Sequence, residues 1–527
     1  MLWNDSRQYT KYACYAESFR STTKVRCFIV SKGEILVRVN FNCMNRRAAL
    51  AALCLFSVQV ALAQTPTAQQ ITAKVDAYMN VAARAKYFNG SVLVARNGQP
   101  LISKGYGMAN HELRVPNKPQ TAFRIGSLTK QFTATAIMML QERRKLNVKE
   151  PICKYLENCP AAWQNVTIHH LLTHTSGIPS YTSLPDFGKI SAQHFTFAGF
   201  VDVFRDKPLE FKPGDKFDYS NSGYYLLGLI VEQVSGASYA EFLRGNVFLP
   251  LGMKNSGYDD SSTVVPNRAS GYYRRKNSFF NADYMNMTIP YSAGALYSTT
   301  EDLLIWEQAL YTDKIIPRTS LDEMFKPLSK KVNRNWDYGY GWGIGKKFDR
   351  AVIGHSGEIN GFSSMLIRFP SERVTVIVLS NNQNANAEEI GEGLSAIVFG
   401  APYDLPAPPV SEMLAATIDQ KGIAFALKQY RELKRAQPNN YDFFTEPVLD
   451  RLGYDLLRNK KVQEAIEILK LNVEMFPTSS NVYDSFGEAY MVNGDKELAI
   501  KNYEKSLELN PKNTNAVDML KKLRGNK

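Results

Sequence analysis

Between residues 70 and 400, short apolar runs near both ends flank a centre in which apolar residues recur every three or four positions. Residues 90–105 alternate in the manner of two strands joined at Asn97-Gly98, a dipeptide typical of a tight hairpin turn. Further strands are predicted at 351–354, 362–369 and 374–379, and helices at 131–142, 223–234 and 300–310. Strands at both ends with helices between them predict an α+β domain over 70–400, whose antiparallel sheet unites distant parts of the chain.

Residues 401–412 separate this segment from a wholly helical one. Four prolines lie within 401–411, which predicts a stiff linker and a domain boundary. In residues 413–527 the pattern of the tetratricopeptide repeat occurs twice with a 34-residue period, first at Leu449, Leu452, Gly453, Leu456, Ala465, Leu469 and Pro477, then at Tyr483, Phe486, Gly487, Tyr490, Ala499, Tyr503 and Pro511. A degenerate third unit is indicated by Ala426, Tyr430 and Pro438.

Such repeats bury their apolar faces only by stacking on one another, which predicts an all-α repeat domain over 413–527. Two roles for it remain open. It could form a groove that binds a protein or peptide partner, or it could be a module that packs against the first domain.

The N-terminal residues have the pattern of a signal for export. Met44-Asn-Arg-Arg47 is a short basic segment, residues 48–62 are almost wholly apolar, and Ala61-Leu-Ala63 is typical of a cleavage site. We therefore expect a signal peptide over 44–63 and a secreted or periplasmic protein that keeps no stable membrane span. Residues 1–43 resemble neither a signal nor a domain, and we interpret them as a spurious upstream extension. The alternative for 44–63 is a short uncleaved anchor.

The composition is that of a globular protein, at 44% hydrophobic and 21% charged residues. No apolar run of about 18 residues occurs, which excludes a multi-pass membrane protein. The net charge is +13, but residues 1–47 hold nine Lys and Arg against three Asp and Glu. Since the remaining excess forms no basic block, nucleic-acid binding is not expected.

Two pairs of residues raise the question of a disulfide or a metal site. Cys153 and Cys159 remain after signal cleavage, and an exported chain favours a disulfide between them, although two thiolates could also contribute to a metal site. His170 and His174 have the spacing of zinc ligands on a helix, but the Glu that the metalloprotease motif requires is absent. The sequence therefore predicts no metal and no cofactor.

Candidate chemistry begins at Ser127-Leu-Thr-Lys130, where an amphipathic helix is expected to start. Positions i and i+3 lie on one face of a helix, so Lys130 is expected beside the Ser127 hydroxyl. A serine hydroxyl needs an adjacent base to become nucleophilic, and a buried lysine can lose its proton at neutral pH. The tetrapeptide alone is weak evidence for an active site, because Ser21-Thr-Thr-Lys24 has the same form.

Two further triplets follow in the chain. Tyr219-Ser-Asn221 precedes a helix predicted from about Gly223, and it supplies a phenol that can carry protons and an amide that can orient a carbonyl. The same pattern occurs at Tyr78 and at Tyr284, but the glycine-rich surroundings favour Tyr219. His355-Ser-Gly357 follows a predicted strand, and Gly357 would let backbone approach a ligand closely.

In this order the three motifs resemble those of the serine β-lactamase and penicillin-binding-protein superfamily, in its class C-like esterase and D-aminopeptidase branch. The resemblance covers roughly residues 70–400 and includes stretches typical of that branch at 171–177, 292–298 and 338–342. It implies an antiparallel sheet flanked by helices, a helical subdomain, and a site in the cleft between them.

The resemblance also implies a role for each residue. Ser127 would be the acylated nucleophile, Lys130 its base, and Tyr219 the partner that protonates the leaving group. Substrate-binding roles would fall to Asn221, His355, Gly357 and Glu358, with the amides of Ser127 and Glu358 forming the oxyanion hole.

One departure from the superfamily concerns His355, which stands where many β-lactamases and transpeptidases carry a lysine that helps hold a substrate carboxylate. Histidine is mostly neutral at pH 7. The sequence therefore favours a serine hydrolase acting on an ester, amide or peptide. The alternatives are a catalytically weak protein that binds penicillin or cell-wall peptides and uses the repeats to bind a partner, or a true β-lactamase.

Overall fold

The computed structural model describes residues 10–19, 22–31, 34–41, 66–275, 278–329, 336–406, 410–436, 443, 446–511 and 513–525. The signal peptide expected over 44–63 lies outside these residues, as do residues 407–409 of the expected linker. Among the described residues, no helix is long and apolar enough to cross a membrane.

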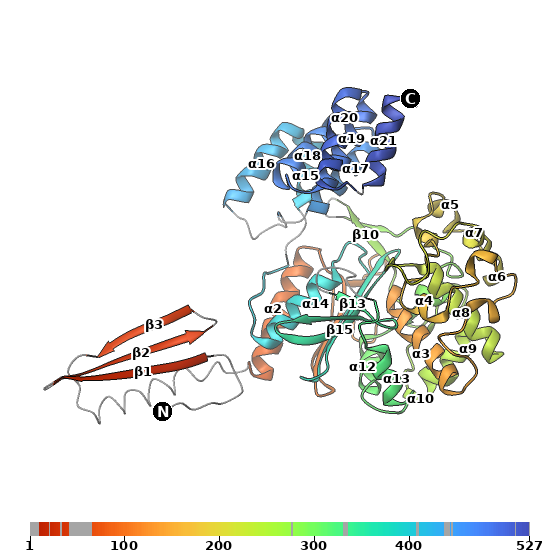
Figure 1. Ribbon diagram of the computed structural model, residues 1–527, viewed down its shortest axis with the longest axis horizontal. Helices are drawn as coiled ribbons and strands as arrows, with labels where there is room; N and C mark the ends of the chain where they lie inside the picture. The colour runs from red at the N-terminus through yellow and green to blue at the C-terminus, as the bar shows by residue number, and fades with distance from the viewer. Residues whose placement is uncertain are drawn as a thin grey trace. The chain divides into compact units, whose positions relative to one another are not determined.

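Residues 1–65 form a unit of their own. Its described backbone runs as three antiparallel strands in the order β1, β2, β3 (Figure 1), with bounds Thr10–Phe19, Thr22–Ser31 and Glu34–Phe41. Residues 22–30 are rich in Thr, Val and Ile, which favour strands. The sequence analysis did not anticipate these strands; the interpretation of residues 1–43 as an upstream extension stays a prediction.

A seven-stranded antiparallel sheet forms the centre of the following unit, in the order β13-β14-β15-β16-β17-β4-β5. The first two strands of the chain segment, β4 and β5, therefore pair beside the last one, β17. The bounds are β4 Gly90–Arg96, β5 Gln99–Tyr106, β13 Trp336–Tyr338, β14 Gly343–Lys347, β15 Arg350–Ile359, β16 Phe362–Phe369 and β17 Val374–Ser380. The α+β prediction, with its sheet joining distant segments, is confirmed.

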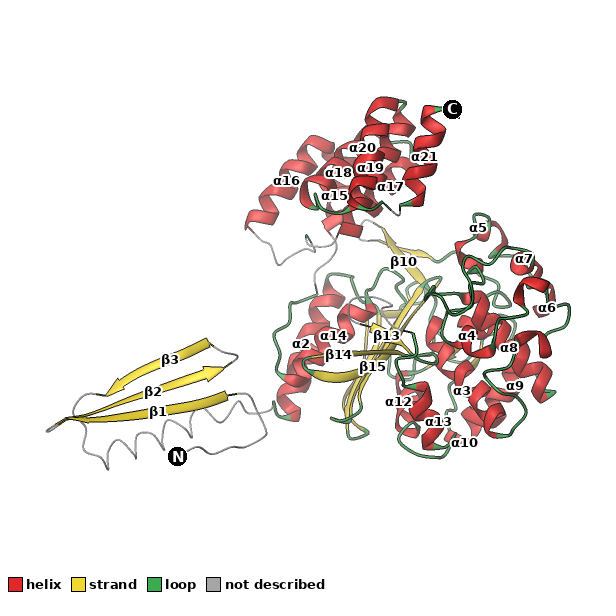
Figure 2. Cartoon of the chain, in the orientation of Figure 1, coloured by secondary structure: helices red, strands yellow, loops and turns green. Residues whose placement is uncertain are grey.

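Both faces of the sheet are covered by helices (Figure 2). Helices α2 (Ala68–Arg84) and α14 (Ala387–Phe399) bury residues such as Ile71 and Ile390 against one face. The other face carries a larger core that includes α3 (Thr129–Glu142), α8 (Asn221–Ser235) and α12 (Thr300–Ala309). Since strand side chains alternate between faces, Val376 joins the first core and Ile377 the second.

Short elements complete the part of the chain between residues 66 and 406. Small antiparallel sheets are β6-β7 (Met108–Asn110, Val115–Pro116), β8-β12-β9 (Phe123–Arg124, Leu296–Ser298, Gly257–Tyr258) and β10-β11 (Tyr272–Arg275, Ser278–Asn281). Short helices are α4 Ile168–Leu172, α5 Phe187–Ile190, α6 Phe197–Phe200, α7 Asp202–Arg205, α9 Tyr239–Leu243, α10 Leu249–Leu251, α11 Tyr291–Gly294 and α13 Arg318–Met324.

Predicted and observed elements agree closely where local signals are strong. The hairpin turns at Asn97 and Gly98, whose φ angles of 53° and 73° are those that this dipeptide tolerates. Two differences concern the site. The helix expected from about Gly223 begins at Asn221, because Ser220 caps it: the Ser220 Oγ accepts a hydrogen bond from the Gly223 amide. The strand expected to end at residue 354 continues to Ile359, because β16 pairs with it along that whole length.

The C-terminal segment is helical throughout its described residues. Its elements are α15 Val410–Lys421, α16 Ile423–Ala436, α17 Glu446–Arg458, α18 Val462–Met475, α19 Ser480–Asn493, α20 Lys496–Leu509 and α21 Thr514–Arg524. The pair α17-α18 and the pair α19-α20 start 34 residues apart. Each pair packs closely at a glycine: a Cβ on Gly453 would lie 2.5 Å from the Leu469 side chain, and one on Gly487 would lie 3.2 Å from the Tyr503 ring.

Candidate active site

Ser127 lies in a single 3-10 turn, η1 (Gly126–Leu128), that leads directly into α3. It is partly exposed, whereas the first twelve residues of α3, up to Leu140, are all buried. Gly126 has a φ of +50°, and a Cβ there would lie 2.8 Å from the backbone nitrogen of Glu358. A glycine before the serine is therefore required both by the backbone conformation and by the close approach of β15.

Lys130 is fully buried, with no exposed surface, one helical turn after Ser127. Its Nζ donates hydrogen bonds to Ser127 Oγ at 3.0 Å, to Asn221 Oδ1 at 2.8 Å and to the carbonyl oxygen of Ala293 at 2.9 Å. No carboxylate is among these acceptors. Burial lowers the pKa of the Lys130 amine well below its usual value, because the charged form loses its hydration and none of its three acceptors is a carboxylate.

Asn221 is held from three directions at the first turn of α8. Its Oδ1 accepts from Lys130, its Nδ2 donates to Thr182 Oγ1 at 3.1 Å, and its backbone nitrogen donates to Ser180 Oγ at 3.1 Å. These contacts fix which end of the amide faces the lysine. Asn221 lines the cleft, where a second N–H of its Nδ2 group can donate to a substrate carbonyl oxygen.

Tyr219 lies in the loop that ends at the Ser220 cap of α8. Its ring centroid is 4.9 Å from Lys130 Nζ, and its phenol lies close enough to the Ser127 hydroxyl for the two to interact. Burial raises the pKa of the Tyr219 phenol, and the interaction with the Ser127 hydroxyl partly opposes that shift. The structure thus brings the hydroxyl, the amine and the phenol into one cluster, and Asn221 completes it.

His355 lies within β15 and borders the cleft, but both of its ring nitrogens are engaged. Nδ1 lies 2.5 Å from the carbonyl oxygen of Ser356 and must donate to it, so Nε2 accepts from the Tyr338 hydroxyl at 2.8 Å. Burial, followed by the nearby charge of Lys130, lowers the pKa of His355 to about 4. At neutral pH this position therefore carries no positive charge.

Gly357 and Glu358 lie where β15 passes closest to η1. A Cβ on Gly357 would lie 2.2 Å from the carbonyl oxygen of Ile125 and 2.9 Å from the backbone nitrogen of Ser127. Only glycine fits here, and its absent side chain lets the backbone around Ser127 and Glu358 come together. The Glu358 side chain is exposed and accepts a hydrogen bond from Gln383 Nε2 at 3.2 Å.

The cleft above Ser127 has one polar and one apolar wall. The polar wall follows the second half of β15 and the residue after it, and its polar side chains are His355, Ser356, Glu358 and Asn360. The apolar wall comes from the helical side and contains Tyr181, Phe187, Met285, Ile289 and Pro290. A substrate group that binds against this wall would therefore bury its surface against apolar side chains.

The structure adds two site residues to those predicted. Tyr338 holds His355, and His174 stacks on Tyr219 with ring centroids 4.1 Å apart. Tyr338 had been noted only as part of a typical stretch. His174 had been weighed as a metal ligand with His170, but α4 ends at Leu172 and His174 has a left-handed φ of 55°. The two imidazoles accept hydrogen bonds from different backbone amides, Thr167 and Ser220.

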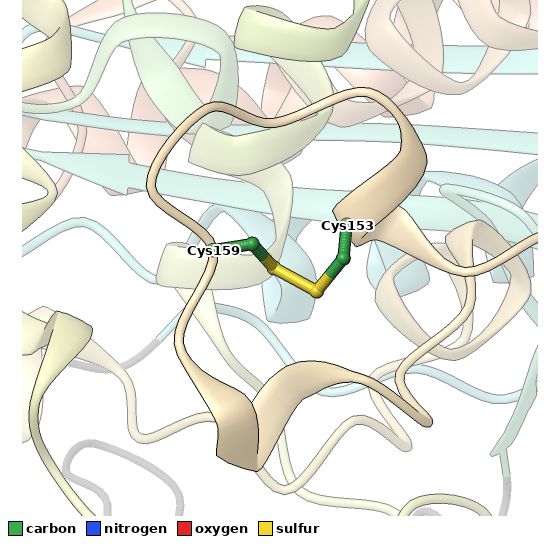
Figure 3. The surroundings of a disulfide bond; sticks show 2 residues. All are labelled: Cys153 and Cys159. Atoms are coloured by element: carbon green, nitrogen blue, oxygen red, sulfur yellow. A yellow bond between two sulfur atoms is a disulfide. The ribbon is translucent and has the colours of Figure 1, made fainter.

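Away from the cleft, Cys153 and Cys159 are joined by a disulfide (Figure 3). Their Cα atoms are 5.3 Å apart, and the bond closes a short loop that begins within the 3-10 turn Ile152–Lys154. Among the residues that the structure describes, no group of three or more His, Cys, Asp or Glu side chains is arranged to hold a metal ion.

The fold and the clustered motifs define a serine hydrolase of the β-lactamase and penicillin-binding-protein superfamily. Residues 71–396 match the Beta-lactamase family, and the chain belongs to it. Penicillin-binding protein 4* of Bacillus subtilis (strain 168) is 30% identical over 434 residues, which cover 79% of this chain and 95% of that protein.

Solved structures agree with this assignment. The penicillin-binding protein from Bacillus halodurans has a TM-score of 0.55 and 31% identity, and the match covers 61% of this chain and 98% of the other. The D-amino acid amidase from Ochrobactrum anthropi SV3, complexed with D-phenylalanine, has a TM-score of 0.54 and 23% identity, covering 62% and 99%. At 23% identity, the similarity to the amidase shows a shared fold alone.

Proposed function

We propose that this chain is an exported serine hydrolase that cleaves an ester, amide or peptide through an acyl-serine intermediate. The observation that carries the proposal is the fully buried Lys130 amine, 3.0 Å from the Ser127 hydroxyl and with no carboxylate among its partners. An amine in that setting is uncharged at a lower pH than usual, and only the uncharged amine can accept a proton.

In the proposed acylation, neutral Lys130 accepts the Ser127 proton as Oγ attacks the substrate carbonyl carbon. The carbonyl oxygen takes the negative charge and is stabilised by the backbone N–H groups of Ser127 and Glu358. When the intermediate collapses, Tyr219 donates its hydroxyl proton to the leaving amine or alcohol and regains one from Lys130. Water then attacks the acyl-serine, which releases the acid and restores Ser127.

Asn221 and the cleft walls would orient the substrate. Its Nδ2 group, fixed by the contacts of Oδ1 with Lys130 and of Nδ2 with Thr182, is suited to hold the substrate's acyl-side carbonyl. The apolar wall favours an apolar or aromatic group beside the scissile bond. Names among the similar proteins include a D-amino acid amidase, which supports D-amino-acid amides as one substrate class to test.

The neutral state of His355 favours uncharged substrates over penicillins. A penicillin or a peptide ending in a carboxylate is bound better when a cation faces that carboxylate. Here the position holds an imidazole whose nitrogens are committed to Tyr338 and Ser356. Ester and amide hydrolysis is therefore proposed as the main activity, ahead of β-lactam hydrolysis.

We also propose that the C-terminal helices are tetratricopeptide repeats. The 34-residue offset between α17-α18 and α19-α20 supports this, as does the matching glycine in each pair, Gly453 and Gly487. In such arrays neighbouring repeats bury a continuous core and leave a concave surface free, which suits a peptide partner.

The proposal is tested by labelling the full chain with a fluorophosphonate probe and locating the adduct by mass spectrometry. We expect one adduct on Ser127, none in Ser127→Ala, and normal labelling in the exposed-serine control Ser262→Ala. Hydrolysis of p-nitrophenyl esters, D-amino-acid amides and nitrocefin then ranks the substrates. Labelling without turnover of any substrate would favour a binding protein, and nitrocefin as the best substrate would favour a β-lactamase.

A further inference from the structure

His174 is a buried histidine outside the predicted catalytic set, yet it makes close contacts around Tyr219. It is 1% exposed and has a φ of +55°, a left-handed conformation that is uncommon for residues other than glycine and in which asparagine, aspartate and histidine are enriched. A buried, left-handed residue beside a reactive group calls for a specific reason, because the conformation persists only where the surroundings impose it.

Backbone carbonyl groups within residues 174–177 accept hydrogen bonds from the loop that carries Tyr219. The amide of Glu210 donates to Gly177 at 2.8 Å, that of Gly214 to Thr175 at 2.8 Å, and that of Asp218 to the carbonyl oxygen of His174 at 2.8 Å. This loop contains no helix or strand between residues 210 and 220. Its course therefore depends on these contacts.

The His174 side chain adds two contacts on the other side of Tyr219. Its Nδ1 accepts a hydrogen bond from the Ser220 amide at 3.1 Å, and its ring stacks on the Tyr219 ring at 4.1 Å with an interplanar angle of 32°. Together with the Asp218 contact, one residue binds the backbone N–H of the residue before Tyr219, the backbone N–H of the residue after it and the Tyr219 ring itself. Both the position and the tilt of the phenol are thereby restricted.

These contacts require a neutral imidazole. Because Nδ1 accepts from the Ser220 amide, the ring proton must lie on Nε2, and Nε2 has no hydrogen-bond partner among the described residues. A proton on Nδ1 would face the Ser220 N–H and break that contact. Burial, followed by electrostatic repulsion from the protonated forms of Lys130 and His355, holds the pKa of His174 well below its ordinary value.

We propose that His174 is a positioning residue for Tyr219, holding the phenol at the orientation in which it can pass a proton between Lys130 and the leaving group. The inference rests on the proposed function of Tyr219. A reacting group must be held to within about 0.5 Å and 10–20° of its productive geometry, and loops seldom do this unaided. The backbone and ring contacts of His174 provide that restraint here.

The test is a double-mutant cycle on the full chain, using steady-state hydrolysis of a D-amino-acid amide, whose amine leaving group must be protonated, and the rate of fluorophosphonate labelling. His174→Phe keeps a stacking ring but removes the acceptor for Ser220. We expect it to lower kcat about tenfold or more with KM changed less than about twofold, since misplacement of a reacting group by about 1 Å can cost 100-fold. In a Tyr219→Phe background, the same substitution should change kcat by less than about twofold, because there is no hydroxyl left to position.

His174→Asn is the conservative variant, because its Oδ1 can accept from Ser220 and asparagine tolerates the left-handed conformation. It should retain about a third of the wild-type kcat or more, and its remaining deficit should also vanish with Tyr219→Phe. If His174→Phe does not fold, His174→Asn replaces it in the double-mutant cycle with Tyr219→Phe. The control is His170→Asn, which alters a nearby imidazole that accepts from Thr167, and it should leave kcat unchanged.

Two results would overturn the inference: wild-type kcat in folded His174→Phe, or an equal loss of kcat with and without the Tyr219 hydroxyl. Failure of the proposed function would look different. In that case the wild-type chain itself would show no Ser127-dependent labelling or turnover, and no variant of His174 would need to be measured.

Discussion

The Lys130 amine lies 3.0 Å from the Ser127 hydroxyl and is anchored on its other sides by Asn221 and by the carbonyl oxygen of Ala293. An ammonium has three N–H donors, and each has an acceptor here. After loss of one proton, the lone pair can face Ser127 while the other two hydrogen bonds remain. The amine can therefore change its protonation state without changing its position, which is what a base in acyl transfer requires.

Replacing Lys130 by arginine should abolish most of the activity while keeping a positive charge at the site. A guanidinium does not lose its proton in proteins, so it cannot accept one from Ser127. We expect kcat to fall by about 10²–10⁴-fold, the usual contribution of a general base. Ester hydrolysis under substrate saturation measures this directly.

Lys145→Arg is the matched control. Lys145 is exposed and lies three residues after the end of α3, so it should tolerate the change. Thermal unfolding of both variants separates a chemical loss from a folding defect. Near-normal hydrolysis by a folded Lys130→Arg chain would contradict the assignment of Lys130 as the base.

His355 should make the stability of the fold depend on pH. Its pKa is about 4 in the folded state and near 6.5 when unfolded, so only the unfolded chain takes up this proton between those values. Stability is therefore present above pH 6.5 and is lost as the pH falls towards 4. A difference of this size corresponds to about 3 kcal/mol of unfolding free energy across the window.

Urea unfolding at several pH values between about 4 and 8 tests this, with His355→Gln expected to show a shallower slope by one proton. His174, also buried and neutral, retains its own contribution in that variant. An unchanged slope in His355→Gln would show that His355 takes up its proton equally in both states.

How much of the site the sequence can predict depends on how local each contact is. Ser127 and Lys130 are one helical turn apart, so their meeting follows from helix geometry. The turn at Asn97-Gly98 is equally local. In contrast, the contact of Tyr338 with His355 depends on the pairing of β13, β14 and β15, and the stack of His174 on Tyr219 depends on how two loops pack.

Backbone groups are the other reason that part of the site escapes prediction. The third acceptor for Lys130 is the carbonyl of Ala293, and any residue could supply a carbonyl. The strand through His355 was predicted too short because Gly354 and Gly357 weaken strand propensity, whereas pairing with β16 maintains it to Ile359. Tertiary pairing decided the length of that strand, and with it the position of the Glu358 amide.

Breaking the disulfide between Cys153 and Cys159 should destabilise the fold without altering the chemistry. The bond closes a loop with a sequence separation of six, for which chain entropy predicts a contribution of about 2 kcal/mol. We expect the reductant dithiothreitol to lower the urea midpoint of the wild type. The double variant Cys153→Ser with Cys159→Ser should start at that lower midpoint and not respond to reductant.

The rate of Ser127 labelling below the unfolding range serves as the control, since neither cysteine lines the cleft. A wild-type midpoint that does not respond to reductant, in a chain whose mass confirms reduction, would mean that this loop is already ordered by its packing.

Gly357→Ala tests the close approach of β15 to the nucleophile. The added methyl would lie 2.2 Å from the Ile125 carbonyl oxygen, 2.5 Å from Ser364 Oγ and 2.9 Å from the Ser127 nitrogen. These distances are too short for contact, so the strand and the η1 turn must separate. We expect kcat for ester hydrolysis to fall by about 10²–10³-fold, as when one donor to the developing oxyanion is lost. Overpacking should also cost about 1–3 kcal/mol of stability.

The size of the effect on kcat, compared with that on stability, distinguishes an oxyanion hole from ordinary packing. Gly245→Ala is the control, because a Cβ there meets nothing within 4 Å and should change neither quantity. If Gly357→Ala lost stability but kept its kcat at temperatures where it is folded, the amides of Ser127 and Glu358 would not be the groups that stabilise the transition state. A loss of kcat well beyond the loss of folded protein, with KM little changed, is the result that their proposed role requires.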